Sequence, residues 1–184
     1  MPRKLKIAGL IIAGLVVLVV IAAVYLKMNA IGHSSPVTPS PITPTGDRVL
    51  DSIARGVELL KAYQEPDGHF SRGALDPKPA FTAMAVEAIL SSPNPPSADE
   101  PWMAKAIEAI LALQQPDGGI YTPRVPIGNY CTAVSIMALV KADKVKYATQ
   151  IEKAARYIMG IQNTDSSDPD SWGGYGYFPS SRSD

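Results

Sequence analysis

The chain has 184 residues with 17 basic and 17 acidic side chains, so its formal net charge at pH 7 is zero. All of the acidic residues but only 13 of the basic ones follow Lys27, which leaves that longer part acidic. An acidic balance argues against a nucleic-acid partner, which would need a basic surface. Cys131 is the single cysteine, and this excludes an internal disulfide.

The N-terminus combines a basic tail, residues 1–6, with an uncharged apolar run, residues 7–26. At about 1.5 Å per residue, this run spans about 30 Å, the thickness of a bilayer core. We therefore expect a single-pass transmembrane anchor with the lipid bilayer as partner. The basic tail then stays in the cytoplasm and the following domain lies outside it. A cleaved signal peptide is the alternative, although its apolar region usually covers about 7–15 residues.

The next segment, residues 27–46, contains four prolines that alternate with Ser and Thr in "SSPVTPSPITPTG". Proline fixes φ and removes a backbone donor, so this composition favours polyproline II over a packed element. We expect a stalk that holds the domain of residues 47–184 away from the membrane.

Helical periodicity begins after the stalk, and nothing in the sequence is typical of a strand. Three expected helices are amphipathic and two are richer in alanine and apolar on most sides. The amphipathic ones cover about 47–64, 100–115 and 146–162, and the apolar ones about 80–91 and 130–142. The fold class is therefore predicted to be all-α.

An internal repeat relates these helices. The string Gln-x-Pro-Asp-Gly occurs at 64–68 and again at 114–118, and Thr82 and Thr132 are also 50 positions apart. A third copy begins with "KAARYIMGIQ" at 153–162. Pro-Asp-Gly is a turn signal, and the Gln amide can pair with backbone groups at the helix end or in the turn. We interpret the motif as structural, with these residues: Gln64, Asp67, Gly68, Phe70, Gln114, Asp117, Gly118, Tyr121, Gln162, Gly173, Gly174 and Tyr175.

This pattern resembles the Gln-Trp repeat of squalene-hopene cyclases and other triterpene cyclases, a fold that protein prenyltransferase β subunits share. The resemblance covers about residues 47–177, with Phe70, Tyr121 and Tyr175 in place of the family tryptophan. It implies an α/α toroid, in which the amphipathic helices lie outside and the alanine-rich helices lie inside around a central cavity. Such a ring takes five or six helix pairs, whereas this chain supplies two and a half. We therefore expect a fragment of a longer protein, with self-assembly of partial rings as the alternative.

The catalytic motifs of the resembled families are incomplete here. The nearest string to the cyclase Asp-x-Asp-Asp is Asp168-Pro169-Asp170-Ser171, which lacks the last acid and is interpreted as a solvated turn. Cys131 stands where prenyltransferases place a zinc-binding Asp-x-Cys, but Asn129 replaces the acid and no suitable histidine follows. A thioester of the complement type would need a Gln three residues after Cys131. We expect neither a metal nor a cofactor, and Cys131, Asp168 and Asp170 remain weak site candidates.

Two functions are compatible with these residues. The favoured hypothesis is a non-catalytic, extracytoplasmic binding or scaffold module whose partner is a protein or polysaccharide. The alternative is the N-terminal part of an enzyme of the squalene/terpene cyclase class that acts on an isoprenoid or another apolar substrate. Family resemblance by itself does not supply chemistry.

Overall fold

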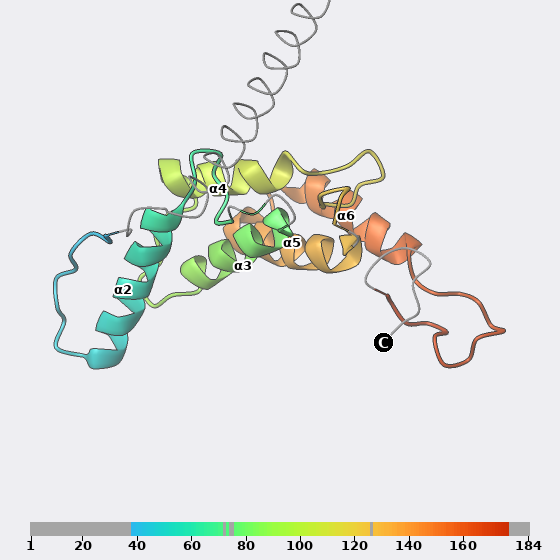
Figure 1. Ribbon diagram of the computed structural model, residues 1–184, viewed down its shortest axis with the longest axis horizontal. Helices are drawn as coiled ribbons and strands as arrows, with labels where there is room; N and C mark the ends of the chain where they lie inside the picture. The colour runs from blue at the N-terminus through green and yellow to red at the C-terminus, as the bar shows by residue number, and fades with distance from the viewer. Residues whose placement is uncertain (1–37, 72, 74–75, 126, 177–184) are drawn as a thin grey trace, which may run out of the picture. The chain divides into compact units, whose positions relative to one another are not determined.

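The computed structural model describes residues 38–71, 73, 76–125 and 127–176. Within these ranges the chain forms five α-helices and no strand, which confirms the predicted all-α class (Figure 1). The helices are α2 (Arg48–Tyr63), α3 (Lys78–Leu90), α4 (Pro101–Leu111), α5 (Gly128–Asp143) and α6 (Ala148–Gly160). They coincide with the five expected helices to within a few residues.

Local sequence explains where the helices begin. The Asp47 carboxylate caps α2, because it accepts hydrogen bonds from the amides of Val49 at 2.8 Å and Leu50 at 3.2 Å. Proline stands in the first turn of α3 and of α4, where its missing N–H is not needed. Helix α4 ends at Leu111, four residues earlier than expected, and residues 112–113 continue as a turn.

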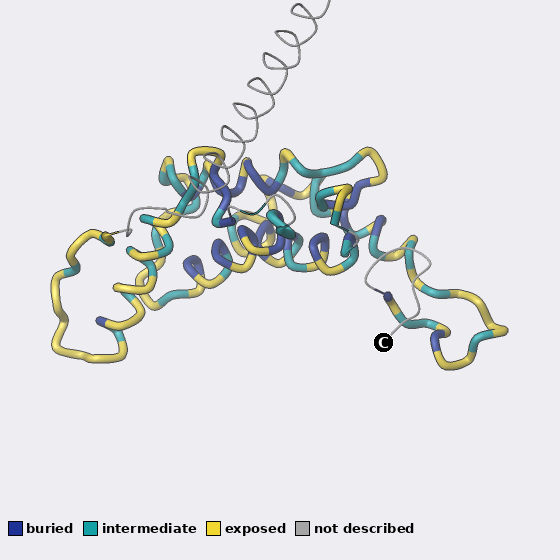
Figure 2. Tube along the Cα trace, in the orientation of Figure 1, coloured by how far each residue is buried: buried dark blue, intermediate teal, exposed yellow. Residues whose placement is uncertain are grey.

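The alanine-rich helices form the centre of the packing. Helix α3 packs against both α4 and α5, and α5 packs against α6. Small side chains permit this close approach: Ala80, Ala83 and Ala138 are at most 1% exposed. Figure 2 shows buried segments gathered on α3, α4 and α5, whereas α2 carries mostly half-buried and exposed residues.

Apart from Ile120, which lies between α4 and α5, the largest buried side chains come from α3, α4 and α5. They are Val86, Ile89, Met103, Ile107, Ile110 and Leu139, all nearly or fully inaccessible to solvent. Burying one such side chain contributes about 1.5–3 kcal/mol relative to leaving it exposed. This shared core is what holds the repeated helices together.

The proposed transmembrane segment, residues 7–26, lies outside the described residues, as does most of the proposed stalk. Among the helices that the structure does describe, none is long and apolar enough to cross a membrane. The described end of the stalk, residues 38–46, contains no helix. Its last part contacts α2, because the Thr45 amide and hydroxyl both donate to Oδ1 of Asp51 at 2.8 Å. These two hydrogen bonds hold the pKa of Asp51 below its usual value.

Candidate functional site

The two Gln-x-Pro-Asp-Gly strings form the same turn. In the first, the amide of Gly68 donates to the carbonyl of Glu65 at 2.9 Å, and the amide of Glu65 donates to the carbonyl of His69 at 2.8 Å. In the second, the bonds from Gly118 to Gln115 and from Gln115 to Gly119 measure 2.9 and 2.7 Å. Proline and aspartate supply the two central residues, as the sequence predicts.

The glutamine of each motif joins its turn to the next amphipathic helix. Nε2 of Gln64 donates to the carbonyl of Gly68 at 3.0 Å and to that of Trp102, in α4, at 2.8 Å. Nε2 of Gln114 donates to the carbonyls of Gly118 and Gln150, in α6, both at 3.0 Å. The glutamine therefore does not satisfy the carbonyls of its own helix end. It links one repeat to the following one.

The glycine of each turn lies directly against that same neighbouring helix. Gly68 has φ +90° and Gly118 has φ +94°, a region that other residues avoid. A Cβ at Gly68 would lie 2.6 Å from the carbonyl oxygen of Lys105, and one at Gly118 would lie 2.5 Å from that of Lys153. Glycine is thus required both by conformation and by the closeness of the helix backbone.

Each aspartate accepts a hydrogen bond from the amide two residues ahead, which for Asp117 is that of Gly119 at 2.9 Å, and one from a further side chain. Asp67 accepts from the amide of His69 and from Nζ of Lys78, at 3.1 and 3.0 Å. Burial by itself would raise the pKa of Asp67, but these two hydrogen bonds lower it. Asp117 accepts from the Tyr121 hydroxyl at 2.7 Å. Burial and this hydrogen bond raise the pKa of Tyr121 to about 12.

The aromatic rings follow no single pattern. Tyr121 packs on Tyr157 of α6, with ring centroids 5.7 Å apart, so it too contacts the following repeat. Phe70 is half-buried against the core. Tyr175 is 39% exposed. Phe70, Tyr121 and Tyr175 therefore do not share one environment.

Two threonines complete the turns and were not assigned a role from the sequence. The hydroxyl of Thr82 accepts from the amide of Phe70 at 3.3 Å, and that of Thr132 accepts from the amide of Ile120 at 2.9 Å. Both threonines are fully buried in the alanine-rich helices. The signal for this role was present, because Thr82 and Thr132 stand 50 positions apart like the motif itself.

His69 is a buried polar residue that sequence reasoning also left aside. Its Nδ1 lies 3.0 Å from the Thr82 hydroxyl. Burial lowers the pKa of His69, so the ring is neutral at pH 7. Its surroundings make it a hydrogen-bonding partner of the turn, and among the described residues it belongs to no group of three potential metal ligands.

The third copy of the motif is arranged differently. Nε2 of Gln162 donates to the carbonyl of Gly173 at 2.8 Å, as in the other copies, but the loop between them is seven residues longer. Hydrogen bonds of 2.9 and 2.7 Å between Asn163 and Gly174 and between Gly173 and Asn163 close this loop. The Asn129 amide also donates to the carbonyl of Gly176 at 2.7 Å, which ties the loop to α5.

The three weak chemical candidates are not brought together. The Cys131 thiol is fully buried in α5, and burial raises its pKa to about 11, which keeps it protonated and unreactive at pH 7. Asp168 and Asp170 lie in the third loop, where the Asp168 carbonyl accepts from the Trp172 amide at 3.0 Å. Within the described ranges no three metal-ligating side chains meet.

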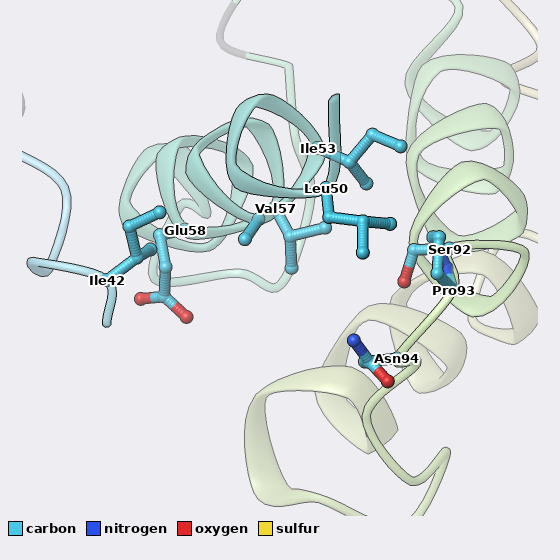
Figure 3. Close-up of a pocket in the computed structure, with 9 residues that line it drawn as sticks. Ile42, Leu50, Ile53, Val57, Glu58, Ser92, Pro93 and Asn94 are labelled. Atoms are coloured by element: carbon cyan, nitrogen blue, oxygen red, sulfur yellow. The ribbon is translucent and has the colours of Figure 1, made fainter. Parts of the chain in front are cut away.

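The concave sites of the described chain are shallow. One, of about 160 Å³, lies between α2 and the segment after α3 and is lined by Ile42, Leu50, Ile53, Val57, Glu58 and residues 92–94 (Figure 3). It is smaller than the roughly 300–1,000 Å³ of typical ligand pockets. A more open groove lies where the second turn meets Lys153 and Arg156. This groove has a volume of about 680 Å³ and is lined by Gln114, Gln115, Asp117, Lys153 and Arg156, so amide, acidic and basic groups gather there on an open surface.

The most distinctive surface is an apolar face on α3 and α5. Phe81, Met84 and Ala88 on α3 are exposed at helical spacing, and so are Tyr130, Ala133, Met137 and Val140 on α5. We call these seven residues the α3–α5 face. The two helices pack side by side, and the Tyr130 hydroxyl lies 3.3 Å from the Met84 sulfur. The two rows therefore adjoin and form one surface.

No known protein family, characterised protein or solved structure matches this chain in sequence or fold.

Proposed function

We propose that this chain is a non-catalytic binding or scaffold module of the α/α-toroid type, in which the α3–α5 face binds an apolar surface of a protein partner. The observation that carries the proposal is the exposure of large apolar side chains on helices that are otherwise buried. Phe81, Met84 and Met137 are between 44% and 51% exposed. Contiguous apolar surface of this kind marks interaction sites in soluble domains.

The chemistry of the face favours a protein over a polysaccharide. Sugar polymers need hydrogen-bonding groups beside the aromatic rings, and the one polar atom of the face is the Tyr130 hydroxyl, which is engaged with Met84. Methionine side chains adapt to varied apolar shapes, which suits a protein surface.

The remaining parts of the proposal rest on the sequence. Residues 7–26 anchor the chain in the bilayer, and the module acts outside the cytoplasm. The resemblance to cyclase and prenyltransferase repeats supports the toroid arrangement, and so does the equivalence of the turns at Gln64 and Gln114. The enzyme of the squalene/terpene cyclase class remains the alternative, with an isoprenoid bound on the same face.

Photo-cross-linking tests the proposal. A benzophenone amino acid is placed at Phe81 or Met137 in the full chain, and native membranes are irradiated. The matched control is Val145, which is 78% exposed but lies outside the α3–α5 face. The proposal expects the same discrete protein adduct from both face positions and none from the control. A lipid-sized adduct would favour the enzyme alternative, and equal labelling from all three positions would refute a specific surface.

A further inference from the structure

The chain contains two copies of one interface between a turn and a helix. Gln64 reaches the carbonyl of Trp102 and Gln114 reaches that of Gln150. Gly68 lies against Lys105 and Gly118 against Lys153. Gln150 and Lys153 on α6 each stand 48 residues after Trp102 and Lys105 on α4. The same backbone carbonyls are therefore contacted in both copies. In both copies, the turn of one repeat packs against the amphipathic helix of the next repeat.

The third turn has no following helix packed against it among the described residues. Gln162 makes the bond within its own turn, to the carbonyl of Gly173, but it is exposed and no bond to a following helix is seen. Gly173 also has positive φ, at +78°, yet a Cβ there would meet nothing within 4 Å. The conformation that prepares Gly68 and Gly118 for helix contact is therefore present without the contact.

Helix α2 has no turn of this kind packed against it among the described residues. The repeat places Ser52, Arg55 and Leu59 where α4 has Trp102, Lys105 and Ala109, and all three are exposed. Leu59 is 40% exposed, whereas Ala109 is 7% exposed and contacts the first turn. A Cβ added to Gly56, on the same side of α2, would meet nothing within 4 Å. This side of α2 is thus open at the positions that a turn covers on α4 and α6.

Burial along the three amphipathic helices supports the same conclusion. Met103 and Ile107 of α4 are fully buried, because α4 has a repeat on either side. Their equivalents on α2, Ile53 and Val57, are exposed and half-buried. Those on α6, Ile151 and Ala155, are half-buried. Helices α2 and α6 therefore retain apolar surface that α4 does not.

We infer that a second copy of this chain docks head to tail, with the third turn of one copy seated on α2 of the next. The Gln162 amide then donates to the Ser52 carbonyl, and Gly173 lies against the backbone carbonyl of Arg55. The contact continues an interface that the chain already makes twice. Charge favours it, since residues 163–176 contain three aspartates and no basic residue, while Arg48 and Arg55 are exposed on α2.

Such an interface is heterologous, because different surfaces of the two copies meet. It predicts either a closed ring or an open array of copies, and it excludes a symmetric dimer through a single patch. The inference does not depend on the α3–α5 face, since neither α2 nor the third turn contributes to that face.

Cross-linking of mixed chains that each carry one added cysteine tests the inference. Leu59→Cys and Trp172→Cys are prepared in the full chain in non-ionic detergent, and a short bis-maleimide is added. The native thiol, Cys131, is buried, so unmodified chain provides the blank. We expect a dimer adduct from the mixture of the two variants and none from either variant alone. Met137→Cys mixed with Trp172→Cys is the matched control and should give no adduct.

Two further variants separate the inference from chance association. Gln162→Ala in the Trp172→Cys chain removes one hydrogen bond and should slow adduct formation by about 2- to 10-fold. Arg55→Glu in the Leu59→Cys chain should slow it further, because it opposes the acidic loop. An absent adduct in the mixture, or equal adducts from single variants, would overturn head-to-tail docking. Failure here leaves the photo-cross-linking result at Phe81 and Met137 unaffected.

Discussion

Replacing Gln114 with Ala tests the bond between repeats. The side-chain amide donates to two carbonyls, one in its own turn and one in α6, each at 3.0 Å. A neutral hydrogen bond contributes about 0.5–1.5 kcal/mol net. Gln114 is half-buried, so water recovers part of the loss. We expect the free energy of unfolding to fall by about 1–2 kcal/mol.

Urea denaturation of the full chain, followed by circular dichroism, measures this change. With a slope of about 2 kcal/mol per molar urea, the midpoint should fall by about 0.5–1 M. Gln64→Ala should behave alike, because Gln64 makes the equivalent pair of bonds. Gln162→Ala, measured at a chain concentration too low for copies to associate, is the matched control, since Gln162 is exposed and makes one such bond within its own chain.

The control decides the interpretation. The midpoint of Gln162→Ala should change by less than half as much as that of Gln114→Ala. If the two variants are equally stable, the bond from Gln114 to α6 contributes nothing, and the turn does not hold the repeats together. Gln114→Glu should be at least as destabilising as Gln114→Ala, because a carboxylate cannot donate to either carbonyl.

Four shorter predictions concern single residues. Gly118→Ala should destabilise the chain by about 1–3 kcal/mol more than Gly173→Ala, because both have positive φ but only at Gly118 would the added Cβ lie 2.5 Å from a helix carbonyl oxygen; equal urea midpoints would contradict this contact. Thr132→Val should lower the free energy of unfolding by about 1–3 kcal/mol in the same assay, because it leaves the buried amide of Ile120 unpaired. Cys131 should react with iodoacetamide at pH 8 no faster than the chain opens, and rapid labelling without urea would show that the thiol is not buried. The pKa of Tyr121 is raised to about 12 in the folded chain, so the unfolded chain loses the hydroxyl proton at lower pH. The free energy of unfolding should therefore fall between about pH 10 and 12. Tyr121→Phe should remove that part of the decline in alkaline unfolding curves.

Helix positions and repeat spacing were predictable from the sequence because both depend on local patterns. The apolar period placed five helices, and the recurrence of Pro-Asp-Gly placed two turns. The role of glutamine was not predictable in the same way. Gln64 and Gln114 bond to carbonyls 38 and 36 residues ahead, and only the packing of one repeat on the next brings those atoms together.

The α3–α5 face was not predictable from the sequence for a different reason. The sequence of an amphipathic helix indicates which side faces water, but α3 and α5 are apolar on nearly all sides. Met84 and Val86 look alike in such a sequence, although Met84 is 47% exposed and Val86 is fully buried. Only the arrangement of the neighbouring helices distinguishes them.

The central claim is that the α3–α5 face is free surface used for binding and not an exposed part of the core. The double variant Met84→Lys/Met137→Lys tests it when the free energy of unfolding and the photo-cross-link from Phe81 are measured on the same preparation. We predict a change in unfolding free energy within about 0.5 kcal/mol, as for surface substitutions, together with loss of the protein adduct. A loss of stability above about 2 kcal/mol, or an unchanged adduct, would contradict the claim.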